Sequence, residues 1–262
     1  YIYASTFMKV PVRKAAFLGD RVASDYMDFF TIHGYEEICC HCVMRRMQGQ
    51  DSPIYDLLDL NGVCTDSNLY RHLSAGGQQV KDIVILPSFE CPRARLGASL
   101  DDYISRLSAS TRYALGRKQR RLEGDFDSIA VEHLDLAQHP ELLDVLFSLH
   151  KDRLELQKDK SSTFFTSFRK EFNERLLHRL GEGEGFFSRV LVAEKPISIL
   201  YVFAYKKHAF FYQNGWDPDF ASYSAGIYNI QQAIQHAIEA GYRSFEFLRG
   251  EEAYKYKFCD DV

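Results

Sequence analysis

The chain has 262 residues, of which 46% are hydrophobic, and a formal net charge of −4. This length and composition suffice to bury one large core or two modest ones, which excludes a disordered protein. The small negative charge gives no global electrostatic reason to bind nucleic acid or an anionic membrane. The longest apolar runs, such as residues 197–205, are much shorter than the roughly 20 residues that cross a bilayer, so we expect no membrane insertion.

Cysteine use points to a reducing compartment and away from a metal site. Six cysteines at irregular spacing do not make a disulfide scaffold, which favours a cytoplasmic location. The run Cys39-Cys40-His41-Cys42 offers zinc-ligand types, but it has neither the spacing of a zinc knuckle nor a second ligand pair. We therefore predict no metal, and a helix over residues 35–47 whose stripe comprises Tyr35, Ile38, Cys39, Cys42 and Arg46.

The first half of the chain predicts short strands and helices in alternation. The chain begins at Tyr1, inside a predicted strand, so we expect the native N-terminus and any targeting signal to precede it. Strands are predicted near residues 2–10, 15–18, 25–30, 54–60 and 80–86, and a short helix over residues 66–73. Residues 100–123 are basic and predicted helical, with Asp101 and Ser110 as N-caps. We expect them to connect an N-terminal lobe, residues 1–99, to a C-terminal lobe, residues 124–262.

The second half predicts a strand near residues 127–132 and then two helices, over residues 137–156 and 165–180. Their predicted core-facing stripes are Leu142, Val145, Leu146, Leu149, Arg153 and Leu156, and Phe168, Phe172, Leu176 and Leu180. Short turns at residues 194–196 and 206–207 require antiparallel pairing of strands at residues 187–193, 197–205 and 208–213. A helix follows from near Gly226 to Gly241, and then a strand over residues 244–248. The predicted fold class is α/β, with mostly antiparallel sheets flanked by helices.

This order of elements, together with three spaced motifs, resembles the GNAT acyltransferase superfamily. The motifs are Ser108 to Leu122 (SASTRYALGRKQRRL), Tyr212 to Gly226 (YQNGWDPDFASYSAG) and Phe245 to Lys255 (FEFLRGEEAYK). Over roughly residues 100–260 they resemble the CelD-like acetyltransferases found with polysaccharide synthesis genes, relatives of the FemAB peptidoglycan enzymes. Residues 17–29 (FLGDRVASDYMDF) look like that family's first half, which implies two GNAT-like lobes in tandem, the first degenerate. Ala225 stands where the family usually has proline.

The loop of the second motif is predicted to bind the donor. A helix N-terminus carries free amides and about half a positive charge, and Ser224, Ala225 and Gly226 are small enough to let a diphosphate approach it. The resemblance implies that the exposed edge of the preceding strand, Phe211, Tyr212, Gln213 and Asn214, pairs with the pantetheine arm of acyl-CoA. Trp216 would then cover the adenine or the acyl arm. We expect Tyr223 to anchor the loop rather than to take part in the reaction. The alternative is that Ser224 is simply an N-cap and Trp216 packs on the sheet edge.

Acyl transfer to an amine requires a base, an oxyanion site and an acid for the leaving thiolate. The resemblance to GNAT enzymes implies that Tyr254 is this acid. Glu246 lies in an apolar strand, where burial is expected to raise its pKa toward that of a useful base; Glu252 and Asp217 are the alternatives. Arg249 and Lys255 are predicted to grip a phosphate or carboxylate of the acceptor. A structural ion pair of Glu246 with Arg249 or Lys255, and a core position for Tyr254, are the competing interpretations.

Asp25 and Tyr26 match an element of that family that faces the acceptor. The resemblance therefore implies that these two residues belong to the acceptor site. The basic residues 112–121 predict either a solvated surface or contact with an anionic acceptor, or with a tRNA. The sequence therefore predicts an acyl-CoA-dependent N-acyltransferase, acetyl-CoA being the expected donor and a sugar-linked amine the expected acceptor. A FemAB-like ligase that uses aminoacyl-tRNA, and a non-catalytic scaffold of GNAT fold, are the alternatives.

Overall fold

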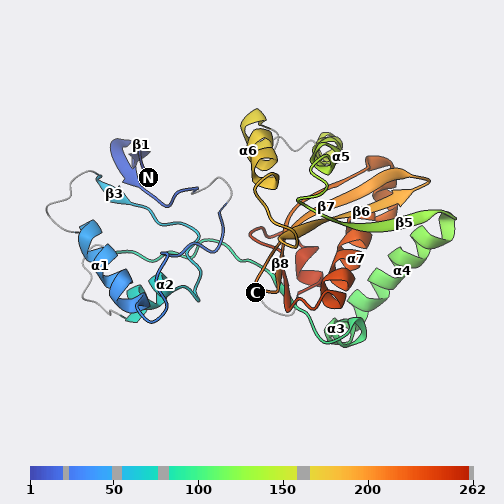
Figure 1. The fold of residues 1–262 in the computed structure, drawn as a ribbon, viewed down its shortest axis with the longest axis horizontal. Helices are drawn as coiled ribbons and strands as arrows, with labels where there is room; N and C mark the ends of the chain where they lie inside the picture. The colour runs from blue at the N-terminus through green and yellow to red at the C-terminus, as the bar shows by residue number, and fades with distance from the viewer. Residues whose placement is uncertain (20–23, 49–54, 76–82, 158–165, 260–262) are drawn as a thin grey trace. The chain divides into compact units, whose positions relative to one another are not determined.

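A computed structural model of the chain describes residues 1–19, 24–48, 55–75, 83–157 and 166–259. It divides into two compact units, Tyr1–Phe89 and Glu90–Val262, shown in Figure 1 and described here one at a time. The division falls before the lobe boundary expected at residue 99. The basic segment expected as a connector, residues 100–123, lies within the second unit.

The first unit holds a small mixed sheet and two helices. Strands β1 (Ile2–Phe7) and β2 (Val10–Ala15) form a hairpin, and β3 (Leu57–Leu58) pairs with β2 in parallel. The single strand predicted over residues 2–10 is wrong, because Met8 and Lys9 adopt positive φ angles of 48° and 68° and turn the chain back. Helices α1 (Glu36–Gln48) and α2 (Asn68–Ala75) lie where helices were predicted.

Three strands predicted in this unit are wrong where the structure describes them. Of residues 15–18 only Ala15 is in a strand, because β2 ends there. Residues 25–30 contain only an isolated bridge between Met27 and Val63, and the Asp28 carboxylate is used to accept the N–H groups of Asn68 and Leu69 at the start of α2. Residues 83–86 are not in a strand, and residues 80–82 lie outside the described chain.

Helix α1 turns a different face inward from the one predicted. Cys40 and Met44 are its buried residues, whereas Tyr35 and Ile38 of the predicted stripe are exposed. The stripe chosen from the sequence was wrong by about one residue's rotation, which is 100° on a helix.

The second unit is built on a six-stranded sheet with the order β4-β9-β8-β7-β6-β5. All neighbours are antiparallel except β8 and β9. The strands are β4 (Arg93–Arg95), β5 (Ile129–Asp135), β6 (Gly185–Val192), β7 (Lys195–Tyr205), β8 (His208–Trp216) and β9 (Ser244–Glu246). The predicted fold class, α/β with mostly antiparallel sheets and flanking helices, is confirmed.

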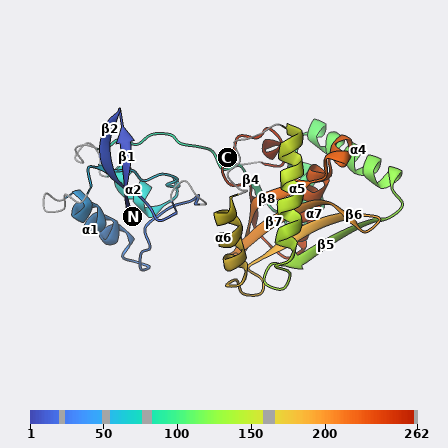
Figure 2. The ribbon, with the colours of Figure 1, turned by 90° about the horizontal axis from the view of Figure 1, so that it is seen from above.

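Helices cover both faces of this sheet (Figures 1 and 2). Helices α5 (Leu142–Gln157) and α6 (Ser167–Leu177) pack on one face, where their leucines surround Phe187, Ile199 and Tyr201. Helices α3 (Leu100–Arg106), α4 (Ala109–Asp125) and α7 (Ala225–Glu239) pack on the other, against Leu200, Val202 and Phe211. Burial of both faces explains the near-continuous apolar sequence of β7.

Four details of the helices differ from the predictions. Leu156, predicted to face the core, is 53% exposed at the end of α5. Ser99 and Ser108, rather than Asp101 and Ser110, cap α3 and α4, by accepting the N–H groups of Asp102 and Thr111 at 3.1 Å. In α6, Phe168 and Phe172 are exposed, at 65% and 43%, and the residues that face the sheet are Asn173 and Leu177. The apolar stripe predicted for this helix is therefore wrong.

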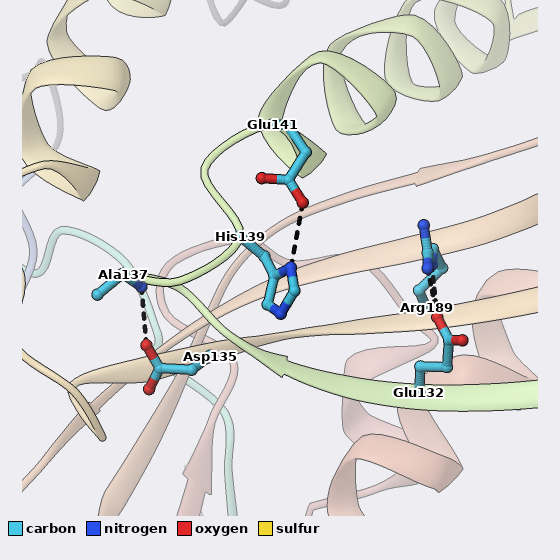
Figure 3. A network of polar contacts seen from close by, with 6 residues as sticks. All are labelled: Glu132, Asp135, Ala137, His139, Glu141 and Arg189. Atoms are coloured by element: carbon cyan, nitrogen blue, oxygen red, sulfur yellow. Dashed lines mark hydrogen bonds and ion pairs between the residues drawn. The ribbon is translucent and has the colours of Figure 1, made fainter.

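The passage from β5 into α5 is fixed by polar contacts at the sheet's outer edge (Figure 3). Asp135 accepts the N–H of Ala137 at 2.8 Å, and His139 contacts Glu141 at 3.1 Å, at the beginning of the helix. Within β5, the carboxylate of Glu132 forms an ion pair with Arg189 of β6. Two of these contacts therefore lie in the connection between β5 and α5, and the third joins β5 to β6.

Candidate active site

The two strands β8 and β9 separate after a short stretch of pairing. They are paired at only three positions, His208, Ala209 and Phe210 of β8 with residues 244–246. Beyond that point β8 continues to Trp216 and, in the part of the chain that is described, pairs only with β7. Tyr201 lies opposite Gln213 and the next residue opposite Phe211, which leaves Tyr212 as the extra residue of a β-bulge. Bulges end pairing and increase twist, so the bulge accounts for the separation.

The separated strand is the one predicted to carry the donor arm. Phe211 is buried on the α7 face and Tyr212 packs on the α5 face, so their backbone groups line the edge between the two faces. Gln213 is half-buried and Asn214 is buried. Residues 211–214 therefore lie where β8 pairs with β7 and no longer with β9, and their assignment to the donor arm stays a prediction.

The N-terminus of α7 lies next to this edge. Ser224 adopts the left-handed conformation, φ 57° and ψ 47°, and its side chain caps nothing. Its carbonyl accepts the N–H groups of Ile227 and Tyr228, whereas those of Ala225 and Gly226 have no partner among the described residues. Two free amides on the positive end of a helix are suited to bind a phosphate or carboxylate.

Side chains from β8 close in on this helix end. A Cβ on Gly226 would lie 3.1 Å from the ring of Trp216 and 3.7 Å from the side-chain nitrogen of Asn214. The ring carbon of Trp216 and the side-chain nitrogen of Asn214 cannot accept a hydrogen bond from the free amides of Ala225 and Gly226. The glycine is needed so that Trp216 and Asn214 can approach the start of the helix.

The loop between β8 and α7 is held by Asp217 and Tyr223. One carboxylate oxygen of Asp217 accepts the N–H of Asp219 at 2.9 Å and the other pairs with Lys195 at 2.6 Å, which raises the pKa of that lysine. Tyr223 lies under Arg121, whose guanidinium carbon is 4.9 Å from its ring centroid. Asp217, predicted as a base, is thereby engaged in holding the loop, and Tyr223 contacts α4.

Tyr254 lies at the other side of the strand separation. It follows β9 and packs against the hydrophobic cluster on the α7 face. Burial, first, and then the nearby Glu252 raise the pKa of its hydroxyl, while Arg153 on α5 lowers it. Tyr254 therefore has a buried hydroxyl in the segment that follows β9.

The predicted acceptor-binding cations are partly engaged by the protein. The ammonium of Lys255, which is 4% exposed, donates to the carbonyl of Arg249 at 2.9 Å and pairs with Glu252 at 2.9 Å. Gly250, at φ 130°, lets the chain fold tightly around them. Lys255 and Glu252 thus stabilise the turn that carries Tyr254.

Glu246 is buried at the closed end of the separation, where β9 still pairs with Phe210. It accepts the hydroxyl of Ser244 at 2.5 Å, and the Nδ1 atom of His208 lies 2.8 Å from the same hydroxyl. The serine's one hydrogen is donated to the carboxylate, so the imidazole is the donor to the serine. A polar chain therefore runs from Glu246 to His208, which sequence reasoning did not single out.

Sequence reasoning also missed two residues of α5, His150 and Arg153. The Nδ1 atom of His150 is 2.6 Å from the carbonyl oxygen of Asn214, and Arg153 donates to the Asn214 side-chain oxygen at 2.9 Å. Arg153 was assigned to an apolar stripe, because its long methylene stem fits one. Polar side chains three residues apart within an otherwise leucine-rich face were the available signal.

Asp25 and Tyr26 belong to the first unit, where both are half-buried and Tyr26 has a φ of 57°. Their assignment to an acceptor site stays a prediction. Among the described residues no group of three or more His, Cys, Asp or Glu is arranged to hold a metal. In that same part of the chain, none of the helices is long and apolar enough to cross a membrane.

Comparison with known proteins agrees with this geometry. A family model described as an acetyltransferase (GNAT) domain matches residues 109–256, which include the separated strands, α7 and Tyr254. Comparison with curated protein sequences finds no match.

Solved structures with TM-scores above 0.5 share the fold. FemX matches with a TM-score of 0.57 at 11% identity, over 96% of this chain and 76% of that one. A conserved protein of unknown function from Bacteroides thetaiotaomicron matches with a TM-score of 0.55 at 14% identity, over 85% of this chain and 72% of that one. The C-terminal domain of an Agrobacterium fabrum protein assigned as a lysylphosphatidylglycerol synthetase has a TM-score of 0.46 at 15% identity, over 65% of this chain. This chain spans 56% of that domain's chain.

Proposed function

The chain belongs to the GNAT acetyltransferase family, and we propose that it transfers an acyl group, acetyl in the simplest case, from acyl-CoA to an amine of a sugar or related small metabolite. The resemblance to CelD-like enzymes extends this proposal to exopolysaccharide or cell-envelope biosynthesis. The observation that carries it is the pair of unbonded amides, Ala225 and Gly226, beside the unpaired edge of β8. A donor with a diphosphate and an amide-bearing arm needs both features.

In this proposal the donor lies along β8. The amides of Ala225 and Gly226 bind its diphosphate, and the edge of residues 211–213 bonds its arm. The carbonyl of Asn214 already has His150 as a donor at 2.6 Å, so the arm's pairing ends before that residue. Trp216, packed beside Gly226, limits the space on that side.

The reaction is direct attack of the acceptor amine on the thioester carbonyl. Asp217 and Glu252 each hold a lysine, so we assign the base role to Glu246, whose carboxylate accepts only a neutral hydroxyl, that of Ser244, among its contacts described above. As the C–S bond breaks, the thiolate takes the hydroxyl proton of Tyr254. Burial keeps this hydroxyl protonated at neutral pH, as an acid must be.

Thermal unfolding with and without donor tests the proposal. Acetyl-CoA and free CoA at about 100 times Kd are expected to stabilise the protein by about 2.7 kcal/mol and to raise its Tm. Tyr254→Phe should keep this shift and lose about 100-fold in kcat, within the range for an acid that acts in the transition state. Tyr113→Phe, an equal change at a residue of α4 that is 67% exposed, is the control. No Tm shift with any acyl-CoA would refute CoA as the donor.

One observation favours an aminoacyl-tRNA donor, the FemAB-like alternative. Lys118 on α4 is half-buried beside Lys257 and Arg117, and burial, followed by these two charges, lowers its pKa. Phosphate groups of a nucleic acid would relieve the repulsion within this cluster of basic side chains. Reversal of the charges at Arg117, Lys118, Arg120 and Arg121 to Glu should then abolish tRNA binding and leave any CoA-induced Tm shift unchanged. If wild-type protein binds tRNA and not CoA, this alternative replaces the first.

A further inference from the structure

Helix α1 of the first unit (Figure 1) presents a row of exposed side chains along one side. Tyr35 is 60% exposed and Ile38 is 57% exposed, and Cys42 and Arg45 are exposed as well. Tyr35 precedes the helix by one residue, but its carbonyl accepts the N–H of Cys39 at 2.9 Å, so it continues the helical turn. Residues three or four positions apart share one side of a helix, so Tyr35, Ile38, Cys42 and Arg45 form one row, the α1 row.

The α1 row lies outside the core of its unit. The residues of α1 that pack inward are Cys40 and Met44, at 0% and 4% exposure. The exposed surface extends into the preceding loop, where Phe30 and Ile32 are 107% and 73% exposed and the carbonyl of Ile32 accepts the N–H of Tyr35 at 2.9 Å. Large apolar side chains exposed side by side in this way mark an interaction surface.

The spacing of the α1 row is self-complementary. Its positions are separated by three, four and three residues, which is the same from either end. A second copy of α1, laid antiparallel across a two-fold axis near residue 40, therefore places Ile38 opposite Cys42 of the second copy and Tyr35 opposite Arg45 of the second copy. The first pair buries apolar surface, and the second has the chemistry of a cation–π pair.

The charges at the ends of α1 favour the same arrangement. Its first turn is acidic, with Glu36 and Glu37, and its last turn is basic, with Arg45 and Arg46. In an antiparallel pair the acidic turn of one helix lies at the level of the basic turn of the other, whereas a parallel pair would bring like charges together. Because the charged residues of the helix cancel, an anionic membrane gains no net electrostatic attraction from it.

We propose that the α1 row is the contact surface for a second copy of this chain, with the two α1 helices antiparallel across a two-fold axis. Two helices that meet over so short a row bury less than the roughly 800 Å² per partner of a standard interface, so we expect a Kd of about 1–100 μM. The inference is independent of the proposed acyl transfer, since α1 lies outside residues 109–256, which match the acetyltransferase model.

Sedimentation equilibrium of the full chain, from about 1 to about 200 μM to bracket this Kd, tests the contact. The average mass of the wild type should rise from that of one chain toward twice that value. Tyr35→Lys places an ammonium opposite Arg45 of the second copy and should raise the Kd at least about tenfold. Tyr113→Lys, the same change at a tyrosine of α4 that is 67% exposed, is the matched control and should associate as the wild type does. A wild type that stays monomeric throughout, or equal association of the two variants, overturns the inference.

Cross-linking tests the antiparallel register. Facing side chains of two packed helices come within reach of a disulfide, so the Ile38→Cys variant treated with diamide should form a covalent dimer through Cys42 of the second copy. Adding Cys42→Ser to that variant should abolish the dimer, and an undiminished yield would refute the register.

Two further experiments separate self-association from other uses of the α1 row. Arg46→Glu and Glu37→Lys each weaken the attraction between helix ends, but a mixture of the two variants restores it at one end, so the mixture should associate more tightly than either variant alone. A mixture no tighter than its components would count against the pairing. A wild type that binds vesicles of phosphatidylcholine and phosphatidylglycerol while remaining monomeric would assign the row to a membrane and overturn the inference.

Discussion

A stacked pair of histidines predicts that the second unit loses stability in mild acid. His133 on β5 and His236 on α7 have ring centroids 4.1 Å apart and planes 14° from parallel, and Phe186 packs edge-on against His236 at 4.7 Å. Burial and then the neighbouring His236 lower the pKa of His133 to about 4, with Glu239 opposing. Burial likewise lowers the pKa of His236, and again Glu239 opposes.

The direction of the pH dependence follows from the linkage between protonation and folding. In the unfolded chain both histidines have a pKa of about 6.5, whereas in the folded chain their pKa is lower. Their contribution is therefore complete above pH 6.5 and is lost as the pH falls toward 4. For His133 the difference at pH 5 amounts to about 2 kcal/mol. Because the ring keeps part of its exposure, solvent screening reduces this to about 1 kcal/mol.

Urea unfolding between pH 7.5 and 5 measures this loss. Trp216 is the only tryptophan and lies in the second unit, so its fluorescence follows that unit. His133→Phe keeps a ring in the stack, removes the titrating group and should flatten the dependence by about 1 kcal/mol over this range. His178→Gln, at an exposed histidine that ends α6, should run parallel to the wild type. Parallel curves for His133→Phe and wild type would refute the reasoning.

Three further changes should alter stability in a set order, measured by the same urea unfolding. Gly215→Ala should cost about 2 kcal/mol or more, because its Cβ would lie 2.6 Å from the backbone of His150 and α5 must shift; a cost below 0.5 kcal/mol would contradict this contact. Asn229→Ala should cost about 2–3 kcal/mol, since it leaves the buried hydroxyl and carbonyl of Ser188 without their partner; a neutral effect would count against that network. Glu132→Gln, at the outer edge pair, should cost less than about 1 kcal/mol, and a larger loss would show that the pair is worth more than an exposed one.

The meander of β6, β7 and β8 could be predicted from the sequence because strongly apolar runs are separated by very short polar links. One link was correct, Lys206 and Lys207, which have φ angles of 46° and 66°. The other was placed one residue late: Ala193 and Glu194 make the turn, at 47° and 66°, and β7 already begins at Lys195. Neither pair contains glycine or asparagine, so local chemistry did not mark which residues would take positive φ.

Helix faces were predicted less well than helix positions. A helical stripe shows which residues are able to be buried, but not which of them the rest of the fold covers. In α6 the phenylalanines at positions 168 and 172 stay exposed and Asn173 faces inward, where its side-chain nitrogen donates to the carbonyl of Arg169 at 2.8 Å. This bond satisfies the amide nitrogen, whereas the side-chain oxygen of Asn173 has no partner among the described residues, so only part of the penalty of burying the amide is removed.

In the candidate site, too, features local in the sequence could be predicted, whereas contacts between residues far apart in the sequence could not. The loop between β8 and α7 and Tyr254 lie in contiguous motifs, so their order could be read directly from the sequence. The bond from Arg153 to Asn214 joins residues 61 positions apart, and it depends on a glycine in β8 that lets α5 come close. The motifs predict which residues lie near the end of β8 and after β9, because each motif is a continuous stretch of sequence. The contact of α5 with the end of β8 depends instead on Gly215, where a Cβ would lie 2.6 Å from the backbone nitrogen of His150, so no motif could predict that His150 and Arg153 reach Asn214.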